Sequence, residues 1–278
     1  MATKKRPEHY GPAHIFYNDE EAQKYTTNTR MIEIQTEMTE RAIELLNLPP
    51  DKPSLLLDLG CGSGLSGECL TDLGHSWIGI DISRSMLDIA RERDVEGDTI
   101  LGDMGEGICF RPGTFDGAIS ISALQWLCNA DKKCHNPVKR VYHFFETLYA
   151  SMKHGSRAIF QVYPENPQQL EMLTSQAIRA GFGGGVVVDY PNSTKAKKIF
   201  LCLFCGVTNI SMPKARGTDV SQNQSVMFTQ RNSRIHKRQK SIKKSRDWIE
   251  EKKERRRRQG KNVRSSTKYS GRKRKPHF

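Results

Sequence analysis

A glycine-rich turn directly follows a short apolar run in the first quarter of the chain. Residues 55–64 read Leu-Leu-Leu-Asp-Leu-Gly-Cys-Gly-Ser-Gly. The run predicts a buried strand, and glycine in the turn permits a positive φ and lets a ligand approach the backbone without interference from a Cβ atom. Asp58, near the end of the run, can accept hydrogen bonds from a ligand's ammonium group or order the turn. We predict a ligand site here, formed by Asp58, Gly60, Cys61, Gly62 and Gly64.

A second carboxylate, Asp81, follows the next apolar run, Trp77–Ile80. A carboxylate at the end of such a strand can accept hydrogen bonds from both hydroxyls of a ribose. Asp81 could instead cap the next helix, but Ser83 and Ser85 offer that role nearby. We therefore favour ribose binding by Asp81, with the adjacent Ile82 lining the same site.

A third carboxylate, Asp103, follows the third apolar run. It could accept a hydrogen bond from the exocyclic amine of an adenine while Met104 packs on the ring; the alternative is a turn aspartate beside a core methionine. Residues 62–67 also satisfy the dinucleotide pattern G-x-G-x-x-G, with Asp81 about 20 residues further on, so a nicotinamide enzyme is a real alternative. The acid-first pattern of residues 58–64 suits a cationic amino-acid ligand without a pyrophosphate. These features favour S-adenosylmethionine, and hence a methyltransferase.

Residues on the acceptor side of such a site are expected after the fourth and fifth apolar runs, because ligands of open α/β sheets lie outside the carboxyl ends of the strands. Gln125, Trp126 and Asn129 follow the fourth run, and Tyr163 follows the fifth. Trp126 could stack on a base, a contact that contributes about 1–3 kcal/mol. It could equally be a core tryptophan that caps the sheet.

The elements that would position these residues are short apolar runs separated by helical or turn segments. This alternation predicts parallel βαβ units. The last two runs, joined by residues 189–198, predict a hairpin and one antiparallel strand. The expected fold is a Rossmann-like α/β methyltransferase fold with a seven-stranded, mostly parallel sheet, and a helix is expected from Asp19 to Leu46. The seven runs are Leu55–Leu59, Trp77–Ile80, Thr99–Leu101, Gly117–Ser122, Ala158–Tyr163, Val186–Val188 and Ile199–Phe204.

Charge is concentrated at the end of the chain. Residues 231–278 carry 21 Lys and Arg against four acidic residues, whereas the preceding residues carry 23 against 27. The basic segment suits nucleic acid or an import receptor as its partner. We expect a methyltransferase domain over residues 1–206, with a polar start and an N-terminal helical cap at 1–50, then a linker at 207–230 and a basic tail at 231–278.

The seven cysteines of the chain show no regular spacing. Cys202 and Cys205 have CxxC spacing but lie in an expected strand, where positions i and i+3 face opposite sides. Cys128, Cys134 and His135 lack a fourth ligand, so we expect no zinc site. No apolar run approaches the roughly 20 residues that span a bilayer, and no membrane association is expected.

Several blocks of sequence are more specific than the glycine turn. They resemble the eukaryotic 18S ribosomal RNA guanine-N7 methyltransferases of small-subunit biogenesis, and the similarity covers nearly the whole chain, with the linker its poorest part. The blocks are Phe16-Tyr17, Glu21-Ala22, Lys24-Tyr25, Asn28, Arg30-Met31-Ile32, Ile34-Gln35, Gly102-Asp103-Met104, Ile119–Leu127, Tyr163-Pro164-Glu165-Asn166, Val188-Asp189-Tyr190-Pro191-Asn192-Ser193 and Gly271-Arg272-Lys273-Arg274-Lys275-Pro276.

The resemblance implies a nuclear enzyme that methylates guanine N7 in 18S rRNA of the pre-40S particle. Guanine N7 has an available lone pair and no proton to remove, so positioning of donor and acceptor can suffice and no general base is expected. Two other functions stay open: an assembly factor with the methyltransferase fold whose catalysis is dispensable, and a small-molecule or protein methyltransferase with a localisation tail.

The resemblance also implies a small zinc-binding activator subunit as partner. By analogy with the fold class, the strand Thr99–Leu101 lies at one edge of the sheet, where unpaired backbone groups invite another chain. The activator could add a strand near Ile100. In the alternative, a loop or helix of this same chain covers that edge.

Overall fold

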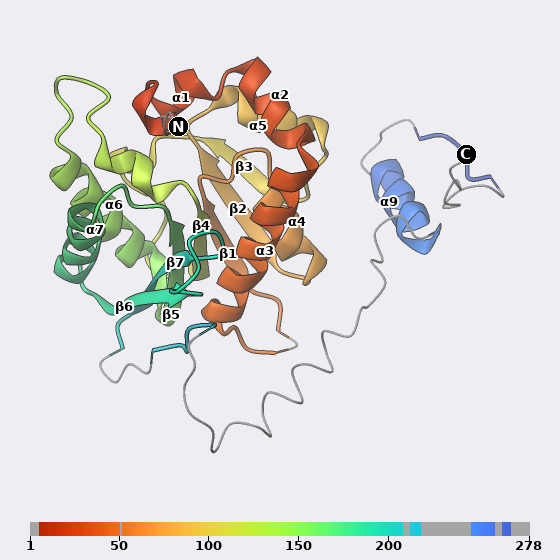
Figure 1. Cartoon of the computed structure of the whole chain (residues 1–278). Coiled ribbons are helices and arrows are strands. Elements are labelled where there is room, and N and C mark those ends of the chain that lie inside the picture. Colours follow the sequence, from red (N-terminus) through yellow and green to blue (C-terminus); the bar gives the residue numbers. More distant parts are fainter. Residues whose placement is uncertain (1–5, 51, 208–211, 218–245, 259–262, 268–278) are drawn as a thin grey trace. The chain divides into compact units, whose positions relative to one another are not determined.

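The computed structural model describes residues 6–50, 52–207, 212–217, 246–258 and 263–267 (Figure 1). The chain divides into a first unit, residues 1–218, and a second unit, residues 219–278, and each is described by itself. No helix in the described residues is both long and apolar enough to cross a membrane.

The first unit contains a seven-stranded sheet in the order β3-β2-β1-β4-β5-β7-β6. All neighbours pair in parallel except β7, which is antiparallel to both β5 and β6. The sequence prediction of seven strands with a terminal hairpin is therefore confirmed, and β3 lies at one edge as expected. The strands are β1 (Leu55–Leu59), β2 (Ser76–Asp81), β3 (Asp98–Leu101), β4 (Phe115–Ile121), β5 (Met152–Val162), β6 (Phe182–Asp189) and β7 (Lys198–Cys205).

Helices cover both faces of the sheet, as the ribbon in Figure 1 shows. Because side chains alternate along a strand, β1 sends Leu57 and Leu59 into the core under α6 and α7, and Leu56 into the core under α3 and α4. Because β1 pairs in parallel with β2 and β4, the carboxyl ends of these strands lie at the same end of the sheet. The helices of the layers are α3 (Thr29–Leu46), α4 (Leu65–Asp72), α5 (Arg84–Glu92), α6 (Pro137–Ser151) and α7 (Pro167–Arg179).

The N-terminal cap departs from the sequence prediction in two ways. The single helix expected from Asp19 to Leu46 is two helices, α2 (Asp19–Thr27) and α3, because the Asn28 side chain accepts from the Met31 amide and caps a new helix. The polar start is also folded: η1 (Pro7–His9) and α1 (Ala13–Phe16) precede α2, and Arg6 donates to the backbone oxygen of Tyr163 at 2.7 Å.

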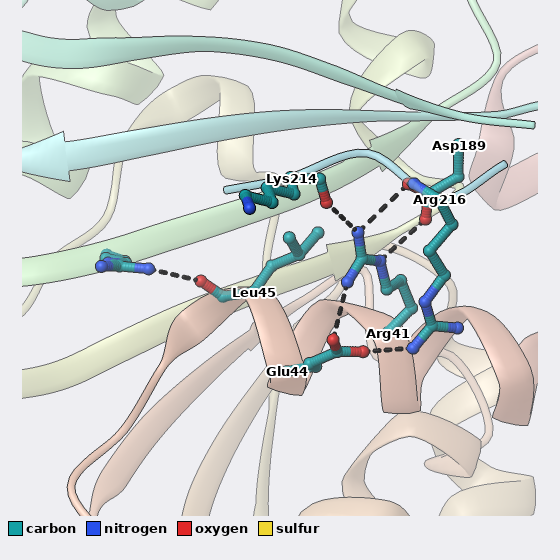
Figure 2. Close-up of polar contacts among 7 residues, drawn as sticks. Arg41, Glu44, Leu45, Asp189, Lys214 and Arg216 are labelled. Carbon is teal, nitrogen blue, oxygen red and sulfur yellow. Dashed lines mark hydrogen bonds and ion pairs between the residues drawn. The ribbon is translucent and has the colours of Figure 1, made fainter. Parts of the chain in front are cut away.

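Residues 212–217, inside the segment that composition predicts to be a linker, belong to the first unit and contact α3 and the end of β6. Figure 2 shows Arg41 of α3 between Glu44, Asp189 and Lys214. Arg41 donates to both carboxylate oxygens of Asp189, at 2.7 and 3.1 Å, and to the backbone oxygen of Lys214 at 2.8 Å. The Arg216 amide donates to Asp189, and its guanidinium pairs with Glu44. Two of these contacts use the backbone of Lys214 and Arg216, and composition gives no signal for a backbone contact.

The described part of the second unit contains one helix, α9 (Arg246–Arg258), inside the basic segment. Lys253 donates to the backbone oxygen of Ser265 at 3.2 Å, which joins α9 to residues 263–267. The basic cluster at residues 252–258 belongs to α9, whereas the cluster at residues 272–275 lies outside the described residues.

Candidate active site

A cavity of about 450 Å³ opens at the carboxyl ends of β1, β2 and β4, beneath the N-terminal cap. It brings together residues from the glycine turn, the ends of β2 and β3, the segment after β4 and the cap. The sequence-predicted residues that line it are Gly60, Cys61, Gly62, Asp81, Ile82, Asp103, Met104, Gln125, Trp126 and Tyr163.

The glycine turn has a backbone that other residues could not adopt there. Gly60 has φ +75°, and its amide donates to the Ile80 oxygen at 2.8 Å. A Cβ atom at Gly60 would lie 2.2 Å from the Cβ of Ala123, and Gly62 also has a positive φ. The turn therefore presents bare backbone to the cavity, as the spacing of glycines predicts.

Asp81 holds the turn in place. Its carboxylate accepts from the Gly62 amide at 2.8 Å and from the Ser83 amide at 2.7 Å. Burial raises the pKa of Asp81, while these backbone hydrogen bonds oppose the rise. Ser83 is the residue that caps α5, accepting from Met86, so the capping alternative for Asp81 is wrong.

Asp58 lies beneath the turn rather than in the cavity. It is fully buried, and Ser66 donates to its Oδ2 at 2.5 Å. Its Oδ1 has no partner in the described residues. Burial raises the pKa of Asp58 to about 7, the charge of Asp81 adds to the rise, and the Ser66 hydroxyl opposes it. Gly64 also lies outside the cavity lining and is the N-cap residue of α4, with φ +80°.

Asp103 is held by an arginine that the sequence did not point to. Arg140 of α6 donates to both carboxylate oxygens of Asp103, at 2.7 and 2.8 Å, and itself lines the cavity. Asp103 also accepts from the Gly105 amide at the start of η2 (Met104–Glu106). Sequence spacing gives no sign of this pair, because 37 residues separate its members.

Three of the acceptor-side residues line the cavity, and the fourth lies beside it. Gln125 and Trp126 belong to η3 (Leu124–Cys128), while Asn129 lines a small adjoining cavity with Gln125. Trp126 is half-buried, with its ring centroid 6.0 Å from that of Phe16. Trp126 is therefore not a fully buried core residue. Its ring contacts Phe16 of the N-terminal cap and also lines the cavity.

The segment between β4 and η3 contains a strained residue. Ser122 has φ +57°, which is uncommon for a residue other than glycine and clusters at functional sites. Its hydroxyl donates to Gln161 Oε1 at 2.6 Å and its amide to the Gln161 oxygen at 3.0 Å. After this residue, Ala123 lies against Gly60 and Gln125 lines the cavity.

The N-terminal cap supplies cavity residues that the sequence prediction missed. Arg6, Glu8, Tyr17 and Tyr25 all line the cavity. Burial raises the pKa of both tyrosines well above the usual range, so their hydroxyls are protonated at neutral pH. In the sequence, the block from Phe16-Tyr17 to Lys24-Tyr25, which resembles the methyltransferase family, is the signal that could have indicated these cap residues.

These residues fit S-adenosylmethionine. Bare backbone at Gly60 and Gly62 forms a cradle that a Cβ atom would fill, Asp81 and Asp103 offer carboxylates, and the buried Ser63 hydroxyl and Asp58 Oδ1 have no partner in the described residues. The turn holds its amides toward Ile80 and Asp81 rather than toward a phosphate site, which favours the methyl donor over a dinucleotide.

Comparison with known protein families places the chain among methyltransferases. Residues 56–143 match a family model described as a methyltransferase domain. Residues 203–276 match a model described as a methyltransferase involved in Williams-Beuren syndrome.

Curated relatives cover the entire chain. The chain is 60% identical to the 18S rRNA (guanine-N(7))-methyltransferase of Mus musculus, over 100% of both proteins. It is 47% identical to the 18S rRNA (guanine(1575)-N(7))-methyltransferase of Saccharomyces cerevisiae, over 98% of this chain and 99% of that protein. The chain belongs to the 18S rRNA (guanine-N7)-methyltransferase family. The family is one of S-adenosylmethionine-dependent methyltransferases, and the resemblance seen in the sequence blocks is confirmed.

Solved structures support the fold of this family member. A TehB-like SAM-dependent methyltransferase from Corynebacterium glutamicum aligns with a TM-score of 0.51 at 16% identity, over 68% of this chain and 100% of that one. A Haloferax volcanii methyltransferase, solved in complex with the Trm112 methyltransferase activator, aligns with a TM-score of 0.50 at 18% identity, over 69% of this chain and 99% of that one. The predicted Rossmann-like class is therefore confirmed.

Proposed function

We propose that this chain transfers the methyl group of S-adenosylmethionine to N7 of a guanine in 18S rRNA, in small-subunit biogenesis. The observation that carries the proposal is the single cavity in which the glycine turn and the segment after β4 meet, in a chain of this family. Donor-side and acceptor-side residues are separate in the sequence, yet they line one space.

The donor side would be held by the turn and three carboxylates. Asp81 would accept from the ribose hydroxyls with the lone pairs that Gly62 and Ser83 leave free, and Asp103 from the adenine amine beside Met104. Gly60 to Ser63 and Ile82 would line the amino-acid and sugar portions, and Asp58 would interact with the ammonium group from its place beneath the turn. When bound, S-adenosylmethionine supplies an electrophilic methyl group on a sulfonium.

The acceptor side would orient the base and exclude water. Trp126 and Tyr163 offer aromatic faces, and Gln125 and Asn129 offer amides. Guanine N7 needs no deprotonation, so positioning of the base is the main requirement. The protonated tyrosines of the cap are consistent with a reaction that needs no general base, because they can donate hydrogen bonds but are not bases at neutral pH.

The decisive experiment pairs two glycine variants, Gly60→Glu and Gly74→Glu. Both residues have a positive φ, but a side chain at Gly60 meets Ala123 whereas nothing lies within 4 Å at Gly74. Each variant replaces the wild-type chain in cells, and N7-methylguanine in 18S rRNA is mapped. We expect loss of the modification in the first variant only. Its persistence in Gly60→Glu cells would refute the proposed activity.

The same cells separate catalysis from assembly. If Gly60→Glu protein accumulates and 18S rRNA matures without the modification, the chain acts in assembly through its physical presence as well. The alternative of a small-molecule or protein substrate would leave the 18S rRNA modification unchanged in cells that lack the chain.

We further propose that the small zinc-binding activator pairs with the open edge of the sheet. Strand β3 pairs only with β2, and its Ile100 and Leu101 side chains are 41% and 52% exposed in the described structure. A related fold has been solved with the Trm112 activator.

Two variants test the two faces of β3. Ile100→Asp and Leu101→Asp should each weaken co-purification of the chain with the activator. Ile178→Asp, on the exposed surface of α7, is the matched control. Undiminished capture by both β3 variants would place the interface elsewhere.

The basic tail at 231–278 would serve nuclear localisation and RNA binding. Its charge predicts phosphate contacts whose strength falls with salt. Truncation after Arg231 should reduce nuclear accumulation and flatten the salt dependence of RNA binding. If neither changes, the tail has another role.

A further inference from the structure

Two hydrogen-bond acceptors without partners lie on the acceptor side of the cavity. Among the described residues, neither Gln125 Oε1 nor Glu8 Oε2 has a hydrogen-bond partner, although both atoms are buried. Both residues line the main cavity and also the small cavity beside it. A buried acceptor left unsatisfied is costly, so a ligand with donors is the expected occupant.

The orientation of the Gln125 amide is set by its surroundings. Its Nε2 donates to the Ser122 backbone oxygen at 2.8 Å, and a carbonyl oxygen can only accept. The amide nitrogen must therefore face Ser122, which leaves Oε1 for the cavity. Gln125 as a whole is only 5% exposed, so bulk solvent has little access to this acceptor.

Glu8 reaches the same space from the N-terminal cap. The nearby basic groups are engaged elsewhere: Arg6 donates to the backbone oxygens of Tyr163 and Pro164, and His9 pairs with Glu165. Glu8 Oε2 thus remains available, and an ionised carboxylate oxygen accepts hydrogen bonds and donates none.

The chemistry that matches these acceptors is the Watson–Crick edge of guanine. Guanine presents N1–H and the N2 amine there, whereas adenine presents an acceptor at N1. We propose that Glu8 and Gln125 bind this edge of the target guanine and thereby determine base specificity; the inference rests on the proposed function. The edge is opposite N7, so a base held this way leaves N7 free to face the methyl donor.

One consequence concerns the RNA. A guanine whose Watson–Crick edge is bound by protein cannot be paired at the same time, so the target must be unpaired or flipped out of its helix. The aromatic rings of Trp126 and Tyr163 in the cavity lining are suited to receive such an unstacked base.

The test removes the amine from the base and the acceptors from the protein. The full chain, co-purified with its activator, is given 18S rRNA fragments carrying guanine, inosine or 7-deazaguanine at the mapped position. Inosine lacks only the N2 amine, and 7-deazaguanine lacks N7. We expect wild-type single-turnover rates to fall roughly 10- to 100-fold from guanine to inosine, the range for losing a hydrogen bond to a buried charged or polar group.

The guanine-to-inosine ratio should shrink toward one in the variant, Glu8→Ala or Gln125→Ala, that has lost the acceptor of the N2 amine. Glu20→Ala removes an exposed carboxylate of α2 and is the matched control. Affinity for S-adenosylhomocysteine checks that each variant is folded. A shrunken ratio in either variant supports the assignment of that residue, and a wild-type ratio in both overturns the proposal.

A variant too slow for rate measurements is tested by equilibrium binding of the guanine and inosine fragments, with the same criterion. Failure of the proposed function would look different. In that case the wild-type protein would not methylate the guanine fragment, or would methylate the 7-deazaguanine fragment equally well.

Discussion

Two arginine–aspartate pairs in this molecule have the same chemistry and different surroundings. Arg41 and Asp189 join α3 to the end of β6, and their side chains are 7% and 3% exposed. Arg140 and Asp103 join α6 to the end of β3, with side chains 11% and 22% exposed, and both line the cavity. In each pair the guanidinium donates to both carboxylate oxygens.

The remaining hydrogen bonds of each pair show what it does. Arg41 also donates to the Lys214 oxygen and contacts Glu44, and Asp189 accepts from the Arg216 amide; Figure 2 shows the pair enclosed by these groups. In the second pair, Arg140 Nη1 contacts the His135 ring and Asp103 accepts from the Gly105 amide, but Arg140 Nε is buried without a partner in the described structure. The first pair is completed by its own chain and fixes structure. The second leaves capacity for a ligand.

The largest expected effect is the loss of stability when the Arg41–Asp189 pair is broken. Asp189→Ala leaves the Arg41 guanidinium buried without its carboxylate, which costs about 3–5 kcal/mol of unfolding free energy. For a domain of this size that is on the order of 10 °C in melting temperature. Thermal unfolding of the full chain with its activator, followed by circular dichroism, measures it.

The matched control is Glu44→Ala, which removes a half-exposed carboxylate from the same network. An exposed ion pair contributes only about 0–1 kcal/mol, so this variant should melt near the wild-type temperature. If the Asp189 variant also does so, the pair is not the anchor of residues 212–217.

Substitution in the Arg140–Asp103 pair should change ligand affinity rather than the free energy of unfolding. Arg140→Ala frees the Asp103 carboxylate from its fixed orientation, and we expect affinity for S-adenosylhomocysteine to fall about 10-fold, equivalent to about 1.4 kcal/mol. Calorimetry measures the affinity, with Arg84→Ala on exposed α5 surface as control. If Arg140→Ala melts at as low a temperature as Asp189→Ala but binds S-adenosylhomocysteine normally, the two pairs have the same structural role and the prediction is wrong.

Sequence reasoning found one member of each pair and missed the other. Asp103 follows a strand and Asp189 lies in a family block, so each had a local signal. Their arginines lie 37 and 148 positions away along the chain, and charge pairing at such distances leaves no spacing pattern. The strand and the positive φ values of the glycine turn, by contrast, depend on adjacent residues and could be predicted. The contact of the turn with Ala123 and the positions of Asp58 and Gly64 outside the cavity lining depend on distant segments, and only the structure shows them.

The N-terminal cap shows the same limit. Its polar first residues lack apolar periodicity, which is the main signal for structure in a sequence. They are fixed instead by hydrogen bonds such as that of Arg6 to the Tyr163 oxygen. A residue such as Glu8 could therefore be placed in the cavity only by the structure.

The smallest expected effect tests a carboxylate that has no arginine at all. Asp58 has a pKa raised to about 7, chiefly by burial. A raised folded-state pKa favours the protonated form in the folded protein, so the associated stability is present below about pH 4 and is lost as the pH rises through about 7. The ligand-free protein should thus become less stable across that window.

A cationic ligand should reverse the preference of this group. If the ammonium group of the donor lies near Asp58, binding favours the carboxylate, so below pH 7 binding releases a proton and affinity for S-adenosylhomocysteine rises several-fold between about pH 6 and 7.5. Calorimetry at pH 6.5 in two buffers of different ionisation enthalpy counts the released proton. Asp58→Asn keeps the shape, including an acceptor for the Ser66 hydroxyl, but cannot titrate, so proton release should disappear. Proton release that persists in Asp58→Asn would assign the titration to another group and place Asp58 with Asp189, as a carboxylate that serves the fold alone.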